Sequence, residues 1–211
     1  TVECITPVFS GIPTDRRIYD GGYAVVPYVT PGTYVTYAFS FTGGALVSWF
    51  VENCARAQKQ EAKEQGKSVY EVLEAGMKDE PTGLLVLPHF AGAGTPYMDT
   101  EAAGAIVGLT LCHHTSDLYR AMMEGVAYGT ENVFQSFRDA GYEVEEIYMG
   151  GGTTNSDLFM QIHADVSNVV VNVPEDPQSC ALGSAILASI GAGVYETFEE
   201  AVAHMVRYSK R

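Results

Sequence analysis

Three consecutive glycines, Gly150 to Gly152, stand between a short apolar run and a helix-like segment in the stretch MGGGTTNSDLFMQ. Glycines at such a junction let backbone N–H groups approach a ligand closely, and the dipole of the following helix favours negative charge. The polar residues Thr153 to Ser156 add hydroxyl and amide groups at the mouth of the loop, and the carboxamide of Asn155 can pair with the edge of a base. The loop therefore suits a phosphate or a nucleotide, and a purely structural turn stays open as the alternative.

The glycine loop matches neither of the common phosphate-binding fingerprints. It is not a GxGxxG loop of the dinucleotide-binding type, nor a GxxxxGK[ST] loop of the P-loop type. His113-His114 is the most evident pair of candidate metal ligands, but no carboxylate or cysteine stands at metal-site spacing from it. We therefore predict no metal ligands in the chain, and the loop by itself does not decide between nucleotide site and turn.

The composition defines the class of protein and excludes some partners. A chain of 211 residues, 46% of them hydrophobic, can bury a core, and none of its apolar stretches reaches the length needed to cross a bilayer. The formal net charge of -14 opposes binding to DNA, RNA or an anionic membrane, because these bind clustered cations. A nucleotide is still compatible with this charge, because backbone N–H groups and a metal ion can hold it.

The cysteines and the start of the chain indicate a cytoplasmic fragment. Cys4, Cys54, Cys112 and Cys180 are far apart and form no CxxC pair, so we interpret them as buried free thiols in a reducing cytoplasm. The first residues, TVECITPVFSG, lack the basic segment of a signal peptide and an initiator methionine. The strand-like start is expected for a piece of a longer protein.

The first half of the chain reads as strands followed by helices. Three β-rich segments within the first ~45 residues, separated by DGG and TPG turn signals, predict an antiparallel meander. After Gly43-Gly44 the apolar residues recur at helical spacing through Cys54, and a shorter helix is expected over Val69–Ala75. Leu84–Phe90 is a candidate buried strand. The longest helix is expected to start with Thr115-Ser116 as its N-cap.

The second half alternates strands and helices. Expected elements follow in the order strand Glu146–Met149, glycines, helix Ser156–Val166, strand Val169–Val173 and helix Cys180–Gly191. A capping box at Thr197–Glu200 opens the last helix. Strands first and alternating elements afterwards predict an α/β fold with a mixed sheet and helices packed on it.

One stretch, GAIVGLTLCHHTSDLYRAMMEG, carries a family signature. It combines a small residue, an apolar residue, a glycine and an aliphatic residue with a polar-apolar pair and an acidic end: Gly104, Ile106, Gly108, Leu109, Asp117-Leu118 and Ala121 to Glu124. This pattern resembles the C-terminal signature of the FGGY carbohydrate kinases. Three further segments are similar to that family, on Pro88, Gly92, Pro96 and Asp99, on Gly150 to Asp165, and on Gly43, Gly44 and Trp49.

The resemblance covers essentially the whole chain and implies its fold. It implies that residues 1–211 are the C-terminal, nucleotide-binding half of an FGGY kinase, an actin-like ATPase (RNase H-like) α/β domain. Such a domain has a mixed five-stranded sheet flanked by helices. The sugar-binding N-terminal domain, and with it the catalytic Asp, would lie outside this chain. The chain alone would then be inactive, and no catalytic residue is assigned to it.

The resemblance also implies a reaction and a set of site residues. The parent enzyme would transfer the γ-phosphoryl group of ATP, bound with Mg2+, to a sugar hydroxyl of a ketopentose such as xylulose. The residues expected near the nucleotide are Thr1, Gly44, Ser48, Gly151, Gly152, Thr153, Asn155 and Ser156. Thr1 and the start of the helix at Gly44 would bind the phosphates, and the glycine loop would bind the nucleoside. Glu124 and Asp165, also signature positions, are interpreted as structural.

The expected partners are ATP and a small sugar, the latter bound mainly by the other domain. A homodimer is kept open as a further state, while nucleic acid and membrane are not expected. The alternative from another class is a non-catalytic actin-like nucleotide-binding module with a regulatory or assembly role. A Rossmann oxidoreductase is less favoured, because GxGxxG does not follow the first strand.

Overall fold

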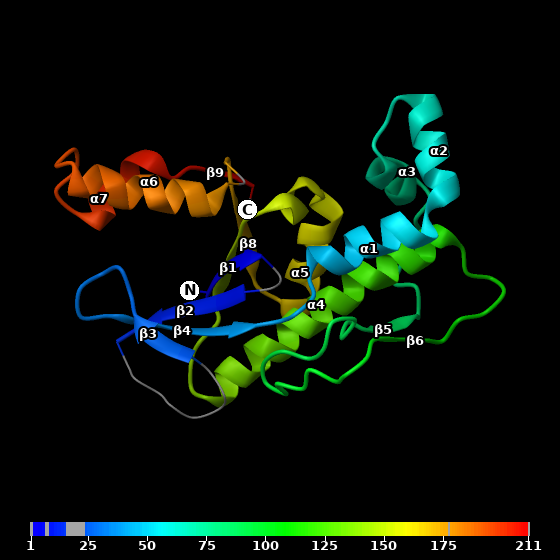
Figure 1. Cartoon of the computed structure of the whole chain (residues 1–211), viewed down its shortest axis with the longest axis horizontal. Coiled ribbons are helices and arrows are strands. Elements are labelled where there is room, and N and C mark those ends of the chain that lie inside the picture. The colour runs from blue at the N-terminus through cyan, green and yellow to red at the C-terminus, as the bar shows by residue number, and fades with distance from the viewer. Residues whose placement is uncertain (1, 7–8, 16–23, 177, 211) are drawn as a thin grey trace.

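The main sheet contains seven strands within the part of the chain that the computed structural model describes, which is residues 2–6, 9–15, 24–176 and 178–210. The strands lie in the order β3-β4-β2-β1-β7-β8-β9 (Figure 1). They are β1 (Val2–Thr6), β2 (Phe9–Thr14), β3 (Ala24–Pro27), β4 (Tyr34–Phe39), β7 (Glu146–Met149), β8 (Val170–Pro174) and β9 (Tyr208–Lys210). A separate antiparallel pair is formed by β5 (Leu85–Leu87) and β6 (Ala105–Val107).

The sheet is mixed, as predicted, but it has more strands than the expected five. β1 pairs in parallel with β7, and β7 pairs in parallel with β8, whereas the other pairs are antiparallel. Five of the seven strands form the centre, and β3 and β9 extend the sheet at its two edges. An edge strand needs only one neighbour, and the three residues of β9 are too few to give a sequence pattern.

The N-terminal strands do not form the predicted three-stranded meander. The described residues contain four strands there, because β2 follows the first predicted segment as an additional strand and shares only Phe9 with it. β4 pairs with both β2 and β3, so β3 lies at the edge and β4 lies inside it. Alternate residues of β4, Thr36 and Ala38, are fully buried, which is why β4 takes the inner position.

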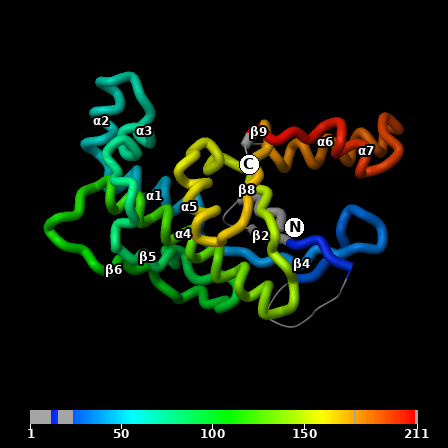
Figure 2. Tube along the Cα trace, turned by 180° about the vertical axis from the view of Figure 1, so that it is seen from behind, coloured from blue at the N-terminus to red at the C-terminus, as the bar shows by residue number. Residues whose placement is uncertain are grey.

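Helices cover both faces of the sheet. The described helices are α1 (Gly44–Cys54), α2 (Arg56–Gln65), α3 (Val69–Ala75), α4 (Thr115–Asp139), the 3-10 helix η1 (Gly152–Asn155), α5 (Asp157–Ser167), α6 (Ser179–Gly191) and α7 (Phe198–Met205). Figures 1 and 2, which view the molecule from opposite sides, show α4 and α5 on one side of the sheet and the α6–α7 pair on the other. Both show α2 and α3 projecting from the body as a helical arm next to α1.

The hydrophobic core lies between α4 and the central strands. Met122, Val126 and Phe137 of the predicted α4 stripe are at most 3% exposed, and Ile147 and Met149 of β7 are fully buried against the same core. Burying side chains of this size contributes about 1.5–3 kcal/mol each, so this layer holds β7 and the loop that follows it in place.

The start of α4 differs from the prediction by one residue. The N-cap is His114, in extended backbone, and Thr115 is already helical. The carboxylate of Asp117 accepts a hydrogen bond from the His114 backbone N–H at 2.8 Å, so this first-turn acid satisfies the N–H of the N-cap residue. α4 stops at Asp139, and Gly141 follows with φ 83°, a conformation that favours glycine.

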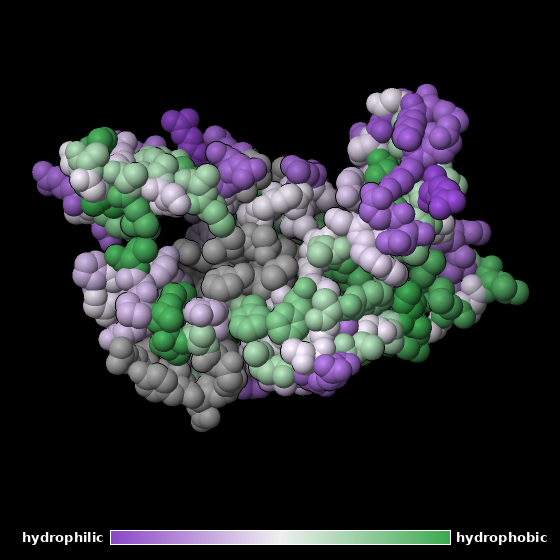
Figure 3. All heavy atoms as spheres, in the orientation of Figure 1, coloured by the Kyte–Doolittle hydropathy of each residue, from purple (hydrophilic) through white to green (hydrophobic). Residues whose placement is uncertain are grey.

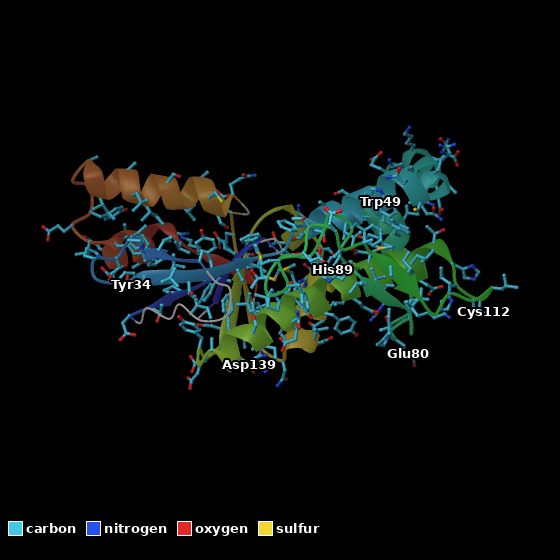
Figure 4. The ribbon with its side chains drawn as sticks, turned by 60° about the horizontal axis from the view of Figure 1, so that its bottom comes forward. Tyr34, Trp49, Glu80, His89, Cys112 and Asp139 are labelled. Atoms are coloured by element: carbon cyan, nitrogen blue, oxygen red, sulfur yellow. The ribbon has the colours of Figure 1, made fainter. Side chains whose placement is uncertain are left out.

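The cysteine prediction was wrong about burial. Cys54, Cys112 and Cys180 are free but exposed. They lie at the end of α1, on the loop before α4 and in the first turn of α6, respectively. Figure 4 places Cys112 at one end of the molecule. The side chain of Cys4 lies outside the described residues. No described helix is both long and apolar enough to cross a bilayer.

Candidate functional site

The glycine loop joins β7 to α5 through a single turn of 3-10 helix. Gly151 has φ 93°, a conformation that favours glycine, and its carbonyl accepts hydrogen bonds from the backbone N–H and the hydroxyl of Thr154. A Cβ on Gly152 would meet nothing within 4 Å, so the backbone there faces open space. Ser156 caps α5, because its Oγ accepts a hydrogen bond from the Phe159 N–H at 3.1 Å.

The N-terminus of α1 lies directly against the glycine loop. A Cβ on Gly44 would stand 2.8 Å from Cγ2 of Thr153, so only glycine permits this approach. No side chain caps the first turn of α1, which follows Gly43. The Leu46 N–H in this turn donates to the Gly43 carbonyl, so the N–H groups of Gly44 and Ala45, together with the helix dipole, suit an anion at this end of the helix.

A cavity of about 650 Å³ opens between these two elements and the α3 part of the helical arm. It is lined by Gly44, Ala45, Val47, Ser48, Ser68, Tyr70, Glu71, Glu74, Tyr119, Gly152, Thr153, Asn155, Ser156 and Phe159. Its size lies within the range of small-molecule sites. Figure 1 shows α3, α1 and the η1–α5 segment around this region, and Figure 3 shows that the outer surface of the arm is hydrophilic.

The cavity brings together most of the site residues that the sequence predicted. Its walls include Gly44, Ser48, Gly152, Thr153, Asn155 and Ser156. Gly151 is not part of the wall and instead shapes the turn through its positive φ. Thr1 lies outside the described residues. The prediction that Ser156 borders the ligand needs one refinement, since its hydroxyl is already engaged within the protein.

Sequence reasoning missed the wall that α3 contributes. Ser156 Oγ donates a hydrogen bond to Oε1 of Glu74 at 2.7 Å, across 82 residues of sequence. The sequence predicted α3 as a helix with no role in the site. The capping box of Ser68 and Glu71 marks the start of this helix, but no local pattern indicates which distant element it will contact.

The side chains that line the cavity are acidic or neutral. Glu71 and Glu74 are the charged residues among them, and no lysine or arginine contributes to the described lining. Burial, followed by the negative charge of Glu74, raises the pKa of Tyr119, so this phenol stays protonated. The buried Oγ1 of Thr153 has no hydrogen-bond partner among the described residues. The cavity walls therefore suit a neutral, polar ligand portion, and an anionic portion fits best at the N-terminus of α1.

The described residues contain no group of three or more His, Cys, Asp or Glu side chains that could hold a metal ion. A second cavity, of about 530 Å³, lies on the far side of the glycine loop. Gly150 and the ends of β7 and β8 contribute to its wall with α6 and α7, and its lining is mostly apolar. The glycine loop thus contributes to the walls of both cavities, and the cavity between α1 and α3, whose lining has more polar side chains, is named the polar cavity.

Three signature residues lie outside the polar cavity. The ring of Trp49 packs edge-on against the ring of Phe90, with the ring centroids 5.1 Å apart, near the loop that carries His89 in Figure 4. Glu124 forms a buried ion pair with Arg120 at 2.8 Å, and Asp165 accepts a hydrogen bond from the glutamine amide one helical turn earlier. These contacts agree with the structural roles expected for Glu124 and Asp165.

Comparisons with known proteins agree with this architecture. The crystal structure of ligand-bound xylulose kinase from Lactobacillus acidophilus matches 99% of this chain and 41% of its own chain, with a TM-score of 0.80 and 20% identity. The structure of Plasmodium falciparum glycerol kinase with ADP also matches 99% of this chain and 41% of its own chain, with a TM-score of 0.79 and 24% identity. The fold is therefore that of an actin-like ATPase domain.

The sequence comparisons add the family. Residues 15–192 match the FGGY family of carbohydrate kinases, C-terminal domain. A ribulokinase from Bacillus licheniformis is 37% identical over 202 residues, which are 90% of this chain and 36% of the ribulokinase. The chain belongs to the FGGY family of carbohydrate kinases, and it spans little more than a third of the length of this relative.

Proposed function

We propose that this chain is the ATP-binding, C-terminal half of a sugar kinase, which transfers the γ-phosphoryl group of ATP to a hydroxyl of a ketopentose. The observation that carries the proposal is the single cavity on which the predicted glycine-loop and α1 residues converge. The structure of the Plasmodium glycerol kinase is a complex with ADP, which supports a nucleotide-binding site in this fold. The ribulokinase and xylulose kinase matches agree with a ketopentose substrate, although glycerol kinases match this chain as well.

In this proposal the chain binds and orients the nucleotide. The nucleoside occupies the polar cavity between Gly152 and α3, where open backbone and the carboxamide of Asn155 meet the base. The phosphates extend toward Gly44 and the uncapped N-terminus of α1, because the acidic walls would repel them elsewhere. Mg2+, the metal expected with ATP, would neutralise phosphate charge when bound. The catalytic base and most of the sugar site are assigned to the remainder of the parent protein.

A valine in place of Gly152 tests the site. The added side chain enters open space, so the fold should survive while the nucleoside is displaced. We expect Gly152→Val to weaken ATP binding, measured by isothermal titration calorimetry, at least about tenfold, equal to a loss of about 1.4 kcal/mol. Gly191→Val, where a Cβ also meets nothing within 4 Å, is the matched control. Equal ATP affinity in parent and Gly152→Val would count against the proposal.

The activity is divided between the two halves in this proposal. The 211-residue chain should bind ATP yet fail to phosphorylate xylulose or ribulose, while the full-length protein should phosphorylate one of them. Robust phosphorylation of either sugar by this chain alone would refute the division. The exposed free thiols are consistent with a reducing compartment such as the cytoplasm, which we propose as its location. No observation favours the non-catalytic alternative.

A further inference from the structure

Glu74 is a cavity-lining residue whose carboxylate is held in one orientation. It lies on the cavity side of α3, half-buried, and its Oε1 accepts the hydrogen bond from Ser156 Oγ at 2.7 Å. The same Ser156 Oγ accepts a hydrogen bond from the backbone N–H of Phe159 at the N-terminus of α5. This bond orients the hydroxyl, and the hydroxyl in turn orients the carboxylate of Glu74. A carboxylate positioned in this way is preorganised to meet a ligand.

The second oxygen of this carboxylate has acceptor capacity left over. No described residue donates a hydrogen bond to Glu74 Oε2, and no cation stands among the described cavity-lining side chains to pair with it. Glu71, the other acid of the wall, differs in this respect. Its Oε2 accepts the Ser68 backbone N–H at 2.7 Å in the capping box at the start of α3.

An ionised carboxylate only accepts hydrogen bonds, and this limits what it can recognise. Phosphate offers no donor and is repelled, whereas the vicinal hydroxyls of a ribose offer two donors. Acidic side chains read the ribose 2′-hydroxyl in other nucleotide sites for this reason. Asn155, with both a donor and an acceptor, is better suited to the edge of the base.

We propose that Glu74 recognises the ribose hydroxyls of the bound nucleotide, with Ser156 as its positioning residue. The inference rests on the proposed ATP site and adds a specificity to it. The chain should select ribonucleotides over 2′-deoxyribonucleotides. A hydrogen bond to a charged group corresponds to a loss of about 10- to 100-fold in affinity when the donor is removed.

The test compares nucleotides across variants by calorimetric titration. Dissociation constants are measured for ATP, 2′-deoxy-ATP, 3′-deoxy-ATP and inosine triphosphate, on the parent chain, Glu74→Gln, Ser156→Ala and the control Glu80→Gln, an exposed acid outside the cavity lining. The parent and Glu80→Gln should bind ATP about 10- to 100-fold more tightly than at least one of the two deoxy analogues. In Glu74→Gln and Ser156→Ala the same ratio should fall toward one, a change that a merely structural role would not produce.

The outcomes separate this inference from the proposed function. Equal affinity of the parent for ATP and both deoxy analogues overturns the role of Glu74 and leaves the ATP site intact. Discrimination against inosine triphosphate alone, lost in Glu74→Gln, also overturns it, because the carboxylate would then read the 6-amino group of the base. Failure of the parent to bind any of the nucleotides overturns the proposed function and the inference together.

Discussion

Replacing the buried histidine of α5 should change how the stability of this protein depends on pH. His163 is fully buried, and its Nδ1 lies 2.9 Å from the carbonyl oxygen of Phe159, so Nδ1 carries the proton that is donated. Its Nε2 has no hydrogen-bond partner among the described residues. Burial, opposed in part by the bond to Phe159, lowers the pKa of His163 to about 4, from a usual value of 6.5.

The direction of the effect follows from the two pKa values. Between pH 6.5 and pH 4 the unfolded chain binds a proton at His163 and the folded chain does not, so stability falls as the pH falls through this window. Relative to pH 7, the loss is about 2 kcal/mol at pH 5 and about 3 kcal/mol at pH 4, at 1.36 kcal/mol per pKa unit.

Urea unfolding at pH 7, 6 and 5 measures this loss. His163→Met, which fills the site without a titrating group, should flatten the pH dependence of the unfolding free energy by about 2 kcal/mol over this range. His204→Gln, at an exposed position of α7, is the control and should leave the parent curve unchanged. A His163→Met curve parallel to the parent curve would refute the reasoning, whatever the variant's stability at pH 7.

Four further substitutions test a close contact at the site, two ion pairs and a helix cap. Gly44→Ala should lower the free energy of unfolding by about 1–3 kcal/mol, measured by thermal unfolding, because its Cβ would stand 2.8 Å from Cγ2 of Thr153. It should also lower the affinity for ATP. An unchanged Tm would argue against this contact. Arg120→Ala should cost about 3–5 kcal/mol, because it leaves the carboxylate of Glu124 buried without its partner, whereas Arg138→Ala, at a more exposed pair, should cost less than about 1 kcal/mol. Similar losses for the two arginine variants would contradict that account. Thr197→Ala should cost about 1 kcal/mol in urea unfolding, because the Thr197 hydroxyl accepts the Glu200 N–H at the start of α7.

Sequence reasoning succeeded where the signal was local. The bounds of α3 and β7 were predicted from apolar residues and neighbouring glycines, and these patterns arise within one element. It failed for the first strands, because pairing between β4 and β2 depends on which residues are buried by distant parts of the chain. The N-cap of α4 differed from the prediction by one residue, and there the Asp117 carboxylate accepts the backbone N–H of His114.

The sequence by itself determined the glycine loop, the family resemblance and six of the residues that line the cavity. Gly44 and Gly152 were identifiable because each belongs to a short segment that resembles the FGGY family. Only the tertiary structure brought Glu74 to Ser156, across 82 residues, and placed Glu74 in the cavity wall. The physical reason is that a local pattern encodes backbone conformation, whereas a wall built from two distant helices depends on how the whole core packs them.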